Sequence, residues 1–166
     1  MKKVCTTTLA LLLTVPLFAP NPGEDIMTIC APTPIKYNME LENRKIRIFS
    51  AIWAVEHPKT KAQARAAFLK EGALGPFQIH KEFVNDVNDI VLKQKKYTHN
   101  DCLDSLKSIE IMTLYHGYYV PAFDTYKVAM THNGGPTWYK ATPKQAKKLQ
   151  EYWYKVNKHL KKNGRS

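Results

Sequence analysis

The chain has 166 residues, of which 44% are hydrophobic, and a formal net charge of +11 at pH 7. This hydrophobic content excludes a disordered chain, and the length suits one domain whose core needs neither a metal ion nor disulfides. The positive charge favours a polyanionic partner: nucleic acid, anionic lipid or the sugar polymers of a bacterial envelope.

The N-terminus indicates the compartment. Two lysines follow Met1, and the apolar run VCTTTLALLLTVPLFA comes next. This pattern predicts a secretory signal peptide over 1–19, because the run is too short for a comfortable transmembrane helix. A leader that is not cleaved and tethers the protein to the membrane is the alternative. Export to the periplasm or beyond argues against a nucleic-acid partner and leaves the cell envelope as the polyanion.

Cysteines and histidines give few constraints. Cys30 and Cys102 are the two cysteines beyond the leader, and they can form one disulfide or stay as two thiols. The sequence contains neither a CxxC nor an HExxH motif, and its six histidines are scattered. We therefore expect no metal site and no cofactor. A monomer is expected.

A proline-rich stretch precedes the first helix. Residues 20–38 contain four prolines, which predicts an extended linker before a domain over 39–163. A helix is predicted over 39–56, where the apolar face that includes Trp53 also carries Glu56. Pro58 ends this helix, because proline disfavours helical backbone in the residue before it.

This position gives Glu56 its chemical interest. On an apolar face, desolvation disfavours the charged carboxylate. At the C-terminus of a helix, the negative end of the helix dipole opposes the charge as well. Both effects raise the pKa, as a general acid that works near neutrality requires. A solvated glutamate at a frayed helix end is the alternative.

A second, alanine-rich helix is predicted over 59–70, and the turn KEGALGPFQIH follows it. Gly72 and Gly75 permit backbone conformations that other residues avoid, and Pro76 stiffens the turn. Gln78 lies between two apolar residues that should point inward, and it offers an amide donor and an acceptor. A plain corner between two helices is the alternative.

Three more helices are predicted. The first covers 81–94, with Phe83, Val87 and either Ile90 or Val91 on its buried side. The second covers 101–119 and carries Tyr115, whose ring is expected either along a ligand groove or in the core. The third is the last helix of the chain, and it begins with a capping box at Thr142. Its core stripe comprises Ala146, Leu149, Trp153, Val156 and Leu160.

Three motifs occur in an order typical of one superfamily. They are AVE ending at Glu56, GALGPFQI from Gly72 to Ile79, and THNGGP from Thr131 to Pro136. Together they resemble the lysozyme-like superfamily, and most closely its secreted or phage-type lytic transglycosylases. The likeness covers roughly residues 45–160. It implies a mostly α, lysozyme-like single domain with little or no β-sheet.

The resemblance also assigns roles. It makes Glu56 the catalytic acid and base, and places Gln78 and Asn133 along a saccharide groove. Four neighbours in the same motifs are counted as substrate-binding with them, as are Trp138 and Tyr115 on account of their aromatic rings. Those four are Phe77, Ile79, His132 and Gly134.

The motifs depart from the transglycosylase pattern at one position and leave the reaction open. His132 stands where transglycosylases usually have tyrosine, and GPFQI with HNGGP is also similar to invertebrate-type lysozymes. Those enzymes hydrolyse the bond with a second carboxylate, for which Glu71 is the candidate here. A solvated loop charge is the alternative for Glu71.

The expected function is therefore cleavage of peptidoglycan glycan strands by one glutamate, without a cofactor. A hydrolytic muramidase and a non-catalytic cationic wall-binding protein are the alternatives. Residues 142–166 hold eight lysines or arginines against one glutamate. This basic helix is either a solvated face or a surface that holds the protein to anionic envelope polymers or lipid.

Overall fold

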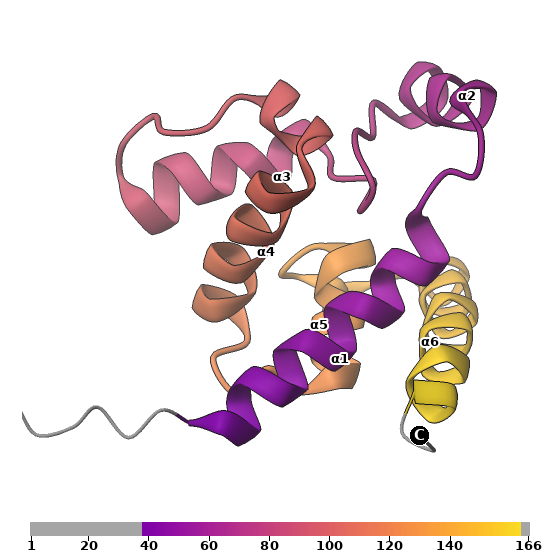
Figure 1. Ribbon diagram of the computed structural model, residues 1–166. Coiled ribbons are helices and arrows are strands. Elements are labelled where there is room, and N and C mark those ends of the chain that lie inside the picture. The colour runs from indigo at the N-terminus through magenta and orange to yellow at the C-terminus, as the bar shows by residue number, and fades with distance from the viewer. Residues whose placement is uncertain (1–37, 164–166) are drawn as a thin grey trace, which may run out of the picture. The chain divides into compact units, whose positions relative to one another are not determined.

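The computed structural model describes residues 38–163, and within this range every regular element is a helix (Figure 1). The α-helices are α1 (Met39–Glu56), α2 (Lys61–Glu71), α3 (Lys81–Asp86), α4 (Ser105–Tyr119), α5 (Thr125–Gly134) and α6 (Pro143–Asn163). The other helices are a π-helix, η1 (Val87–Leu92), and two 3₁₀-helices, η2 (His99–Leu103) and η3 (Trp138–Lys140). The mostly-α prediction is confirmed. The predicted signal peptide and nearly all of the proline-rich linker lie outside the described residues.

Helix α1 has the bounds that the sequence predicts. The Asn38 side chain accepts a hydrogen bond from the Leu41 backbone N–H at 3.1 Å and so caps the first turn. At the other end His57 is extended, and its N–H donates to the Trp53 carbonyl at 2.9 Å. The buried face of α1 packs against α5 and α6, which lie beside it in Figure 1.

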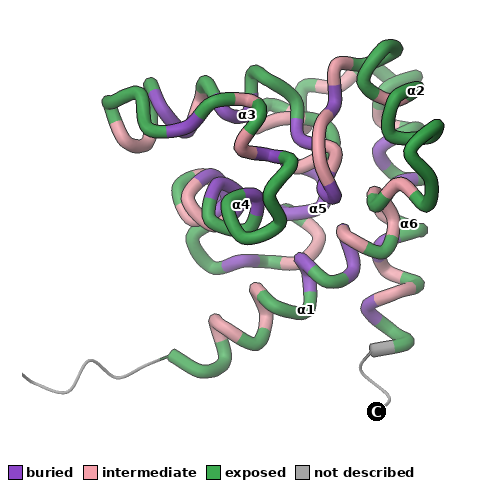
Figure 2. Tube along the Cα trace, turned by 45° about the horizontal axis from the view of Figure 1, so that its top comes forward, coloured by how far each residue is buried: buried purple, intermediate pink, exposed green. Residues whose placement is uncertain are grey.

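Helix α2 lies on the surface. Thr60 caps its start by accepting from the Gln63 N–H at 3.2 Å, and Gly72 ends it in the left-handed conformation, as predicted. No residue of α2 is buried, and its tube in Figure 2 is almost wholly green. The last residue of α2, Glu71, directly precedes residues 72–79, which we call the glycine turn.

The predicted helix over 81–94 is an α-helix only in its first half. After α3, the chain continues as the π-helix η1, which holds more residues per turn than an α-helix. Phe83 and Val87 are buried as predicted, but the wider turn rotates Ile90 outward, where it is 41% exposed. Val91 is half-buried.

The predicted helix over 101–119 is divided in two. Asp104 is extended and accepts hydrogen bonds from the N–H groups of Leu106 and Lys107 at 2.8 and 3.0 Å. This side-chain cap starts α4 afresh after η2, since aspartate satisfies the free N–H groups of a first turn. The division turns Cys102 into a buried residue of η2 rather than of α4.

Helix α5 is not predicted by the sequence pattern. Asp124 caps it by accepting from the Lys127 N–H at 2.8 Å. Four consecutive residues, Val128 to Thr131, are buried. Because four consecutive buried residues extend around most of one helical turn, they form no apolar stripe, and the periodicity that reveals amphipathic helices is absent here. Asn133 and Gly134 are the last two residues of this helix.

In α6 the predicted stripe lies largely against the core. Leu149, Val156 and Leu160 are buried, and Ala146 and Trp153 are half-buried. Tyr152, which the stripe did not include, is buried as well. The lysines of α6 are all exposed: Lys144, Lys147, Lys148, Lys155, Lys158, Lys161 and Lys162.

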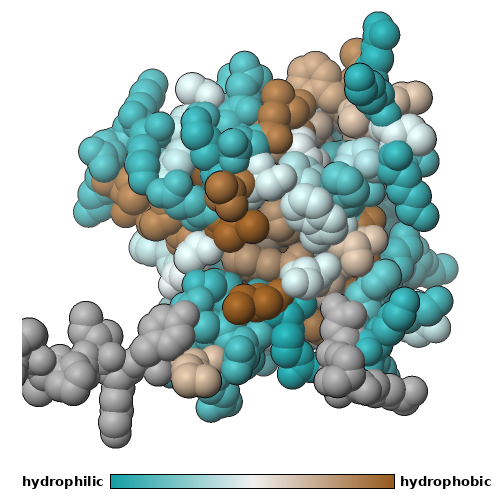
Figure 3. Space-filling view, in the orientation of Figure 1, coloured by the Kyte–Doolittle hydropathy of each residue, from teal (hydrophilic) through white to brown (hydrophobic). Residues whose placement is uncertain are grey.

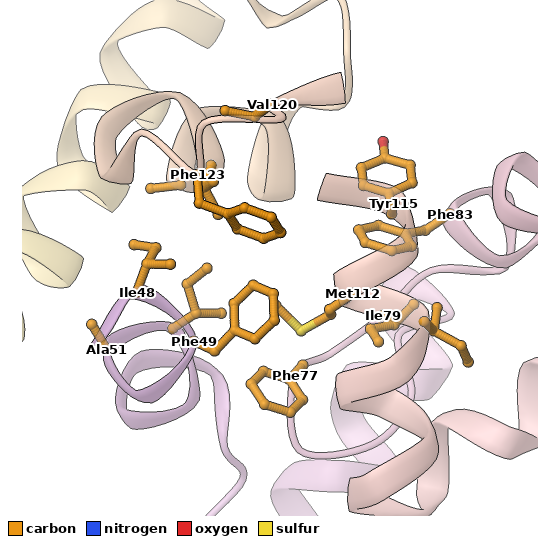
Figure 4. Close-up of a cluster of buried hydrophobic side chains, with 14 of the residues drawn as sticks. Ile48, Phe49, Ala51, Phe77, Ile79, Phe83, Met112, Tyr115, Val120 and Phe123 are labelled. Atoms are coloured by element: carbon orange, nitrogen blue, oxygen red, sulfur yellow. The ribbon is translucent and has the colours of Figure 1, made fainter. Parts of the chain in front are cut away.

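An aromatic cluster joins the helices (Figure 4). Phe49 of α1 meets Phe77 edge to face at 6.4 Å between ring centroids, and Phe123 at 6.0 Å. On the face seen in Figure 3, apolar residues gather near the middle and hydrophilic ones surround them. The core thus fixes the glycine turn, which carries Phe77, against the helix that carries Glu56.

Candidate active site

The glycine turn is held by backbone contacts on both sides. Leu74 and Ile79 pair as an antiparallel bridge, with N–H to carbonyl distances of 2.8 and 3.0 Å. Gly75 has a φ of 76°, and a Cβ there would lie 1.6 Å from the carbonyl oxygen of Cys102. No other residue fits this position without moving the backbone. The prediction that Gly72 and Gly75 supply special backbone conformations is confirmed.

Gln78 adopts a conformation that few residues other than glycine take. Its φ is 49°, in the left-handed region. Its side-chain Nε2 donates to the carbonyl oxygen of Gly75 at 2.7 Å, so the amide is fixed by the turn itself. Strained backbone of this kind persists only where the surrounding structure imposes it, and it gathers at functional sites.

A small pocket of about 80 Å³ lies where the turn meets α1, α2 and α5. Five of its seven lining residues are predicted site residues, drawn from segments up to 77 positions apart in the chain. The sequence prediction missed His80 and Ala73, which have no pattern of their own. The lining residues are Glu56, Glu71, Ala73, Gln78, His80, His132 and Asn133.

The surroundings of Glu56 favour its protonated form. Burial raises the pKa of this carboxyl above its usual value. An interaction with the Tyr152 hydroxyl lowers the pKa, the negative charge of Glu71 raises it, and the Lys155 ammonium lowers it, in decreasing order of effect. The net change is upward, because burial is the largest of these effects. The sequence predicts this direction from the apolar face of α1.

Tyr152 is a neighbour of Glu56 that sequence reasoning missed. Its side chain is 7% exposed, and its hydroxyl makes no hydrogen bond of ordinary geometry within residues 38–163. Burial, and next the nearby Glu56, raise the pKa of Tyr152 far above its ordinary value, so it stays a neutral phenol. The only signal in the sequence is its position three residues after Leu149, a spacing that puts Tyr152 beside the predicted core stripe of α6.

His132 is anchored by the glycine turn. Its Nε2 lies 3.1 Å from the carbonyl oxygen of Phe77, so that nitrogen carries the proton and donates. Burial lowers the pKa of His132 to about 4, which keeps the ring neutral at ordinary pH. Its Nδ1 has no hydrogen-bond partner within the described part of the chain. His132 therefore ties α5 to the turn beside Glu56.

Three of the residues predicted to bind substrate have buried side chains, and the inward direction predicted for Phe77 and Ile79 is confirmed. Phe77 and Ile79 are 2% and 1% exposed, so their side chains anchor the turn in the core instead of facing a ligand. Tyr115 is 2% exposed and stacks on Phe83 at 3.5 Å between ring centroids. A tyrosine on a helix that covers the core buries its ring, and the sequence left this alternative open.

Gly134 and Trp138 lie in a second pocket of about 400 Å³, which shares Asn133 with the first. A Cβ on Gly134 would lie 2.9 Å from atoms of both Leu149 and Trp138, so a glycine there lets α5 end close against α6. The pocket is lined by Asn133, Gly134, Thr137, Trp138, Lys140, Ala141, Gln145, Lys148 and Leu149.

No cluster of three or more metal-ligating side chains occurs within residues 38–163. Cys102 is a free, fully buried thiol, and burial raises its pKa to about 12; Cys30 lies outside the described residues. No described helix is long and apolar enough to cross a bilayer.

Comparisons of the chain with protein-family models, curated proteins and solved structures find no match.

Proposed function

We propose that the protein is a peptidoglycan lytic transglycosylase with a lysozyme-like domain. It would cleave the β-1,4 bond between N-acetylmuramic acid and N-acetylglucosamine, with Glu56 as its general acid and base. One observation carries the proposal: the pocket joins Glu56, whose pKa is raised, to Gln78 and Asn133, the residues that the resemblance assigns to the saccharide groove.

The chemistry requires a carboxyl that is protonated when substrate binds. Glu56 gives its proton to the glycosidic oxygen as the bond to the anomeric carbon breaks. The N-acetyl group of the muramyl unit stabilises the positive charge at that carbon. The Glu56 carboxylate then takes the proton of the sugar's 6-hydroxyl, whose oxygen closes an anhydro ring. Glu56 ends protonated again, and no water is consumed.

The neighbours of Glu56 suit this cycle. The side chain of Gln78 is fixed by its bond to Gly75, so its orientation costs little entropy when a saccharide binds. The neutral Tyr152 hydroxyl and the positive Lys155 ammonium both stabilise the Glu56 carboxylate once its proton has left. These interactions are strongest in the ionised state, as the second half of the cycle needs.

Hydrolysis with a second carboxylate is the competing function. Glu71 lines the same pocket, and its charge affects the pKa of Glu56. However, its side chain is 55% exposed and lies 3.1 Å from the ammonium of Lys70, so water and an ion pair surround it. We favour the single-glutamate cycle because the substrate itself supplies the stabilising group.

Mass spectrometry of digested peptidoglycan separates the two reactions. Purified sacculi are incubated with the protein and with Glu56→Gln. We expect muropeptides one water lighter than reducing ones, with anhydro ends, from the wild type only. Reducing ends would establish hydrolysis and make Glu71 the second catalyst. No soluble product from the wild type would refute both reactions and leave cationic wall binding as the function.

A further inference from the structure

The second pocket carries a charge that the proposed reaction does not use. Lys140 and Lys148 line it, and no acidic side chain does. Neither lysine forms an ion pair with a carboxylate within residues 38–163. The Lys140 ammonium lies over the Tyr139 ring, 5.7 Å from its centroid. The pocket therefore presents two positive charges without a counterion from the part of the chain that the structure describes.

The remaining lining suits a sugar. Trp138 supplies an indole whose orientation is fixed by an edge-to-face contact with Tyr126, at 5.7 Å between ring centroids. Tyr126 is in turn held by Gln150, whose Nε2 donates to its hydroxyl at 2.9 Å. The Gln145 side-chain oxygen accepts from Thr142, which leaves its amide N–H groups to donate to a ligand.

The pocket is also placed and sized for an adjoining unit of the substrate. It shares Asn133 with the Glu56 pocket, so a glycan strand that passes Glu56 can continue into it. Its volume of about 400 Å³ lies within the range of about 300–1,000 Å³ that small-molecule sites occupy. Of the two amino sugars in the strand, only N-acetylmuramic acid carries an acidic arm, its 3-O-lactyl group with or without a peptide.

We propose that this pocket binds a muramyl unit next to the scissile bond, and that Lys140 and Lys148 recognise the carboxylates of its lactyl or peptide arm. This inference rests on the proposed function for the identity of the strand. It makes the protein selective for peptidoglycan over neutral polymers of N-acetylglucosamine, because the two lysines gain a counterion only from the acidic arm.

Binding is measured with the Glu56→Gln protein, which should not turn the ligands over. Three tetrasaccharides of equal length are titrated by NMR: a peptide-bearing muramyl form, the same form stripped of peptide, and neutral chitotetraose. We expect at least one acidic form to bind roughly three- to tenfold more tightly than chitotetraose, and added salt to reduce the difference. Tighter binding of the peptide-bearing form would show that the lysines recognise peptide carboxylates. Tighter binding of the form stripped of peptide would show that they recognise the lactyl carboxylate.

Two further variants of the Glu56→Gln protein test the lysines. Lys140→Gln with Lys148→Gln should abolish the preference. Lys161→Gln, an exposed lysine on α6 roughly 20 Å further along the helix, should keep it. Equal affinity for all three ligands, or a preference that survives the double change, would overturn the inference. Wild-type protein that binds selectively but yields no cleavage products would refute the proposed reaction and leave this inference standing.

Discussion

Glu56 is balanced between neighbours that push its pKa in opposite directions. Burial is the largest effect and raises the pKa, whereas Tyr152 and Lys155 lower it and Glu71 raises it. Tyr152 and Lys155 belong to α6, about 100 positions from Glu56 in the chain. The sequence therefore predicts the effect of burial from α1 alone but not the two groups that oppose it.

Replacing the charged neighbours should move the pH profile in opposite directions. Glu71→Gln removes a repulsion and should lower the pKa of Glu56, whereas Lys155→Gln removes an attraction and should raise it. Because the general acid acts when protonated, activity falls as pH rises through this pKa. The alkaline limb of kcat/KM against pH should therefore move to lower pH in Glu71→Gln and to higher pH in Lys155→Gln. Shifts in the same direction, or none, would contradict this account of Glu56.

At the scale of elements, the backbone conformation of the glycine turn depends on Gly75. Gly75 lies against the Cys102 backbone in η2, whereas a Cβ on Gly72 would meet no atom within 4 Å. Both glycines have a positive φ. The two positions therefore differ in steric room and share the conformational requirement.

Replacing Gly72 and Gly75 by alanine, one at a time, separates the cost of left-handed backbone from the cost of the steric clash. Gly72→Ala should cost about 1–2 kcal/mol of unfolding free energy, the cost of left-handed backbone for a residue with a Cβ. Gly75→Ala should cost more than about 3 kcal/mol, because the backbone of the turn or of η2 must move. Urea denaturation measures both values. Equal losses would show that η2 does not confine the turn.

Local signals explain which elements the sequence predicts. α1 has a side-chain cap at Asn38 and a proline just beyond its end, and its predicted bounds are correct. The break at Asp104 and the π-turn of η1 arise from capping and packing that a periodic pattern does not record. α5 is missed because its buried residues are consecutive, which leaves no stripe.

At the scale of the whole molecule, the site is assembled from distant segments that share no local pattern. The resemblance of three motifs places Glu56, Gln78 and Asn133 together, and one pocket contains them. It does not place Tyr115, because a motif does not tell which face of a helix packs on the core. The exposed lysines of α6 are consistent with a solvated face, and their binding to anionic envelope polymers or lipid stays a prediction.

The most direct test compares two glutamates of the same pocket on the same substrate. Purified sacculi are digested with wild type, Glu56→Gln and Glu71→Gln, and the rate of release of soluble saccharide is measured. We predict that Glu56→Gln loses roughly 10²–10⁴-fold in rate, as expected when a general acid is removed, and that Glu71→Gln loses less than about tenfold. A Glu56→Gln protein that releases saccharide at the wild-type rate would contradict the assignment of Glu56 as the catalytic acid.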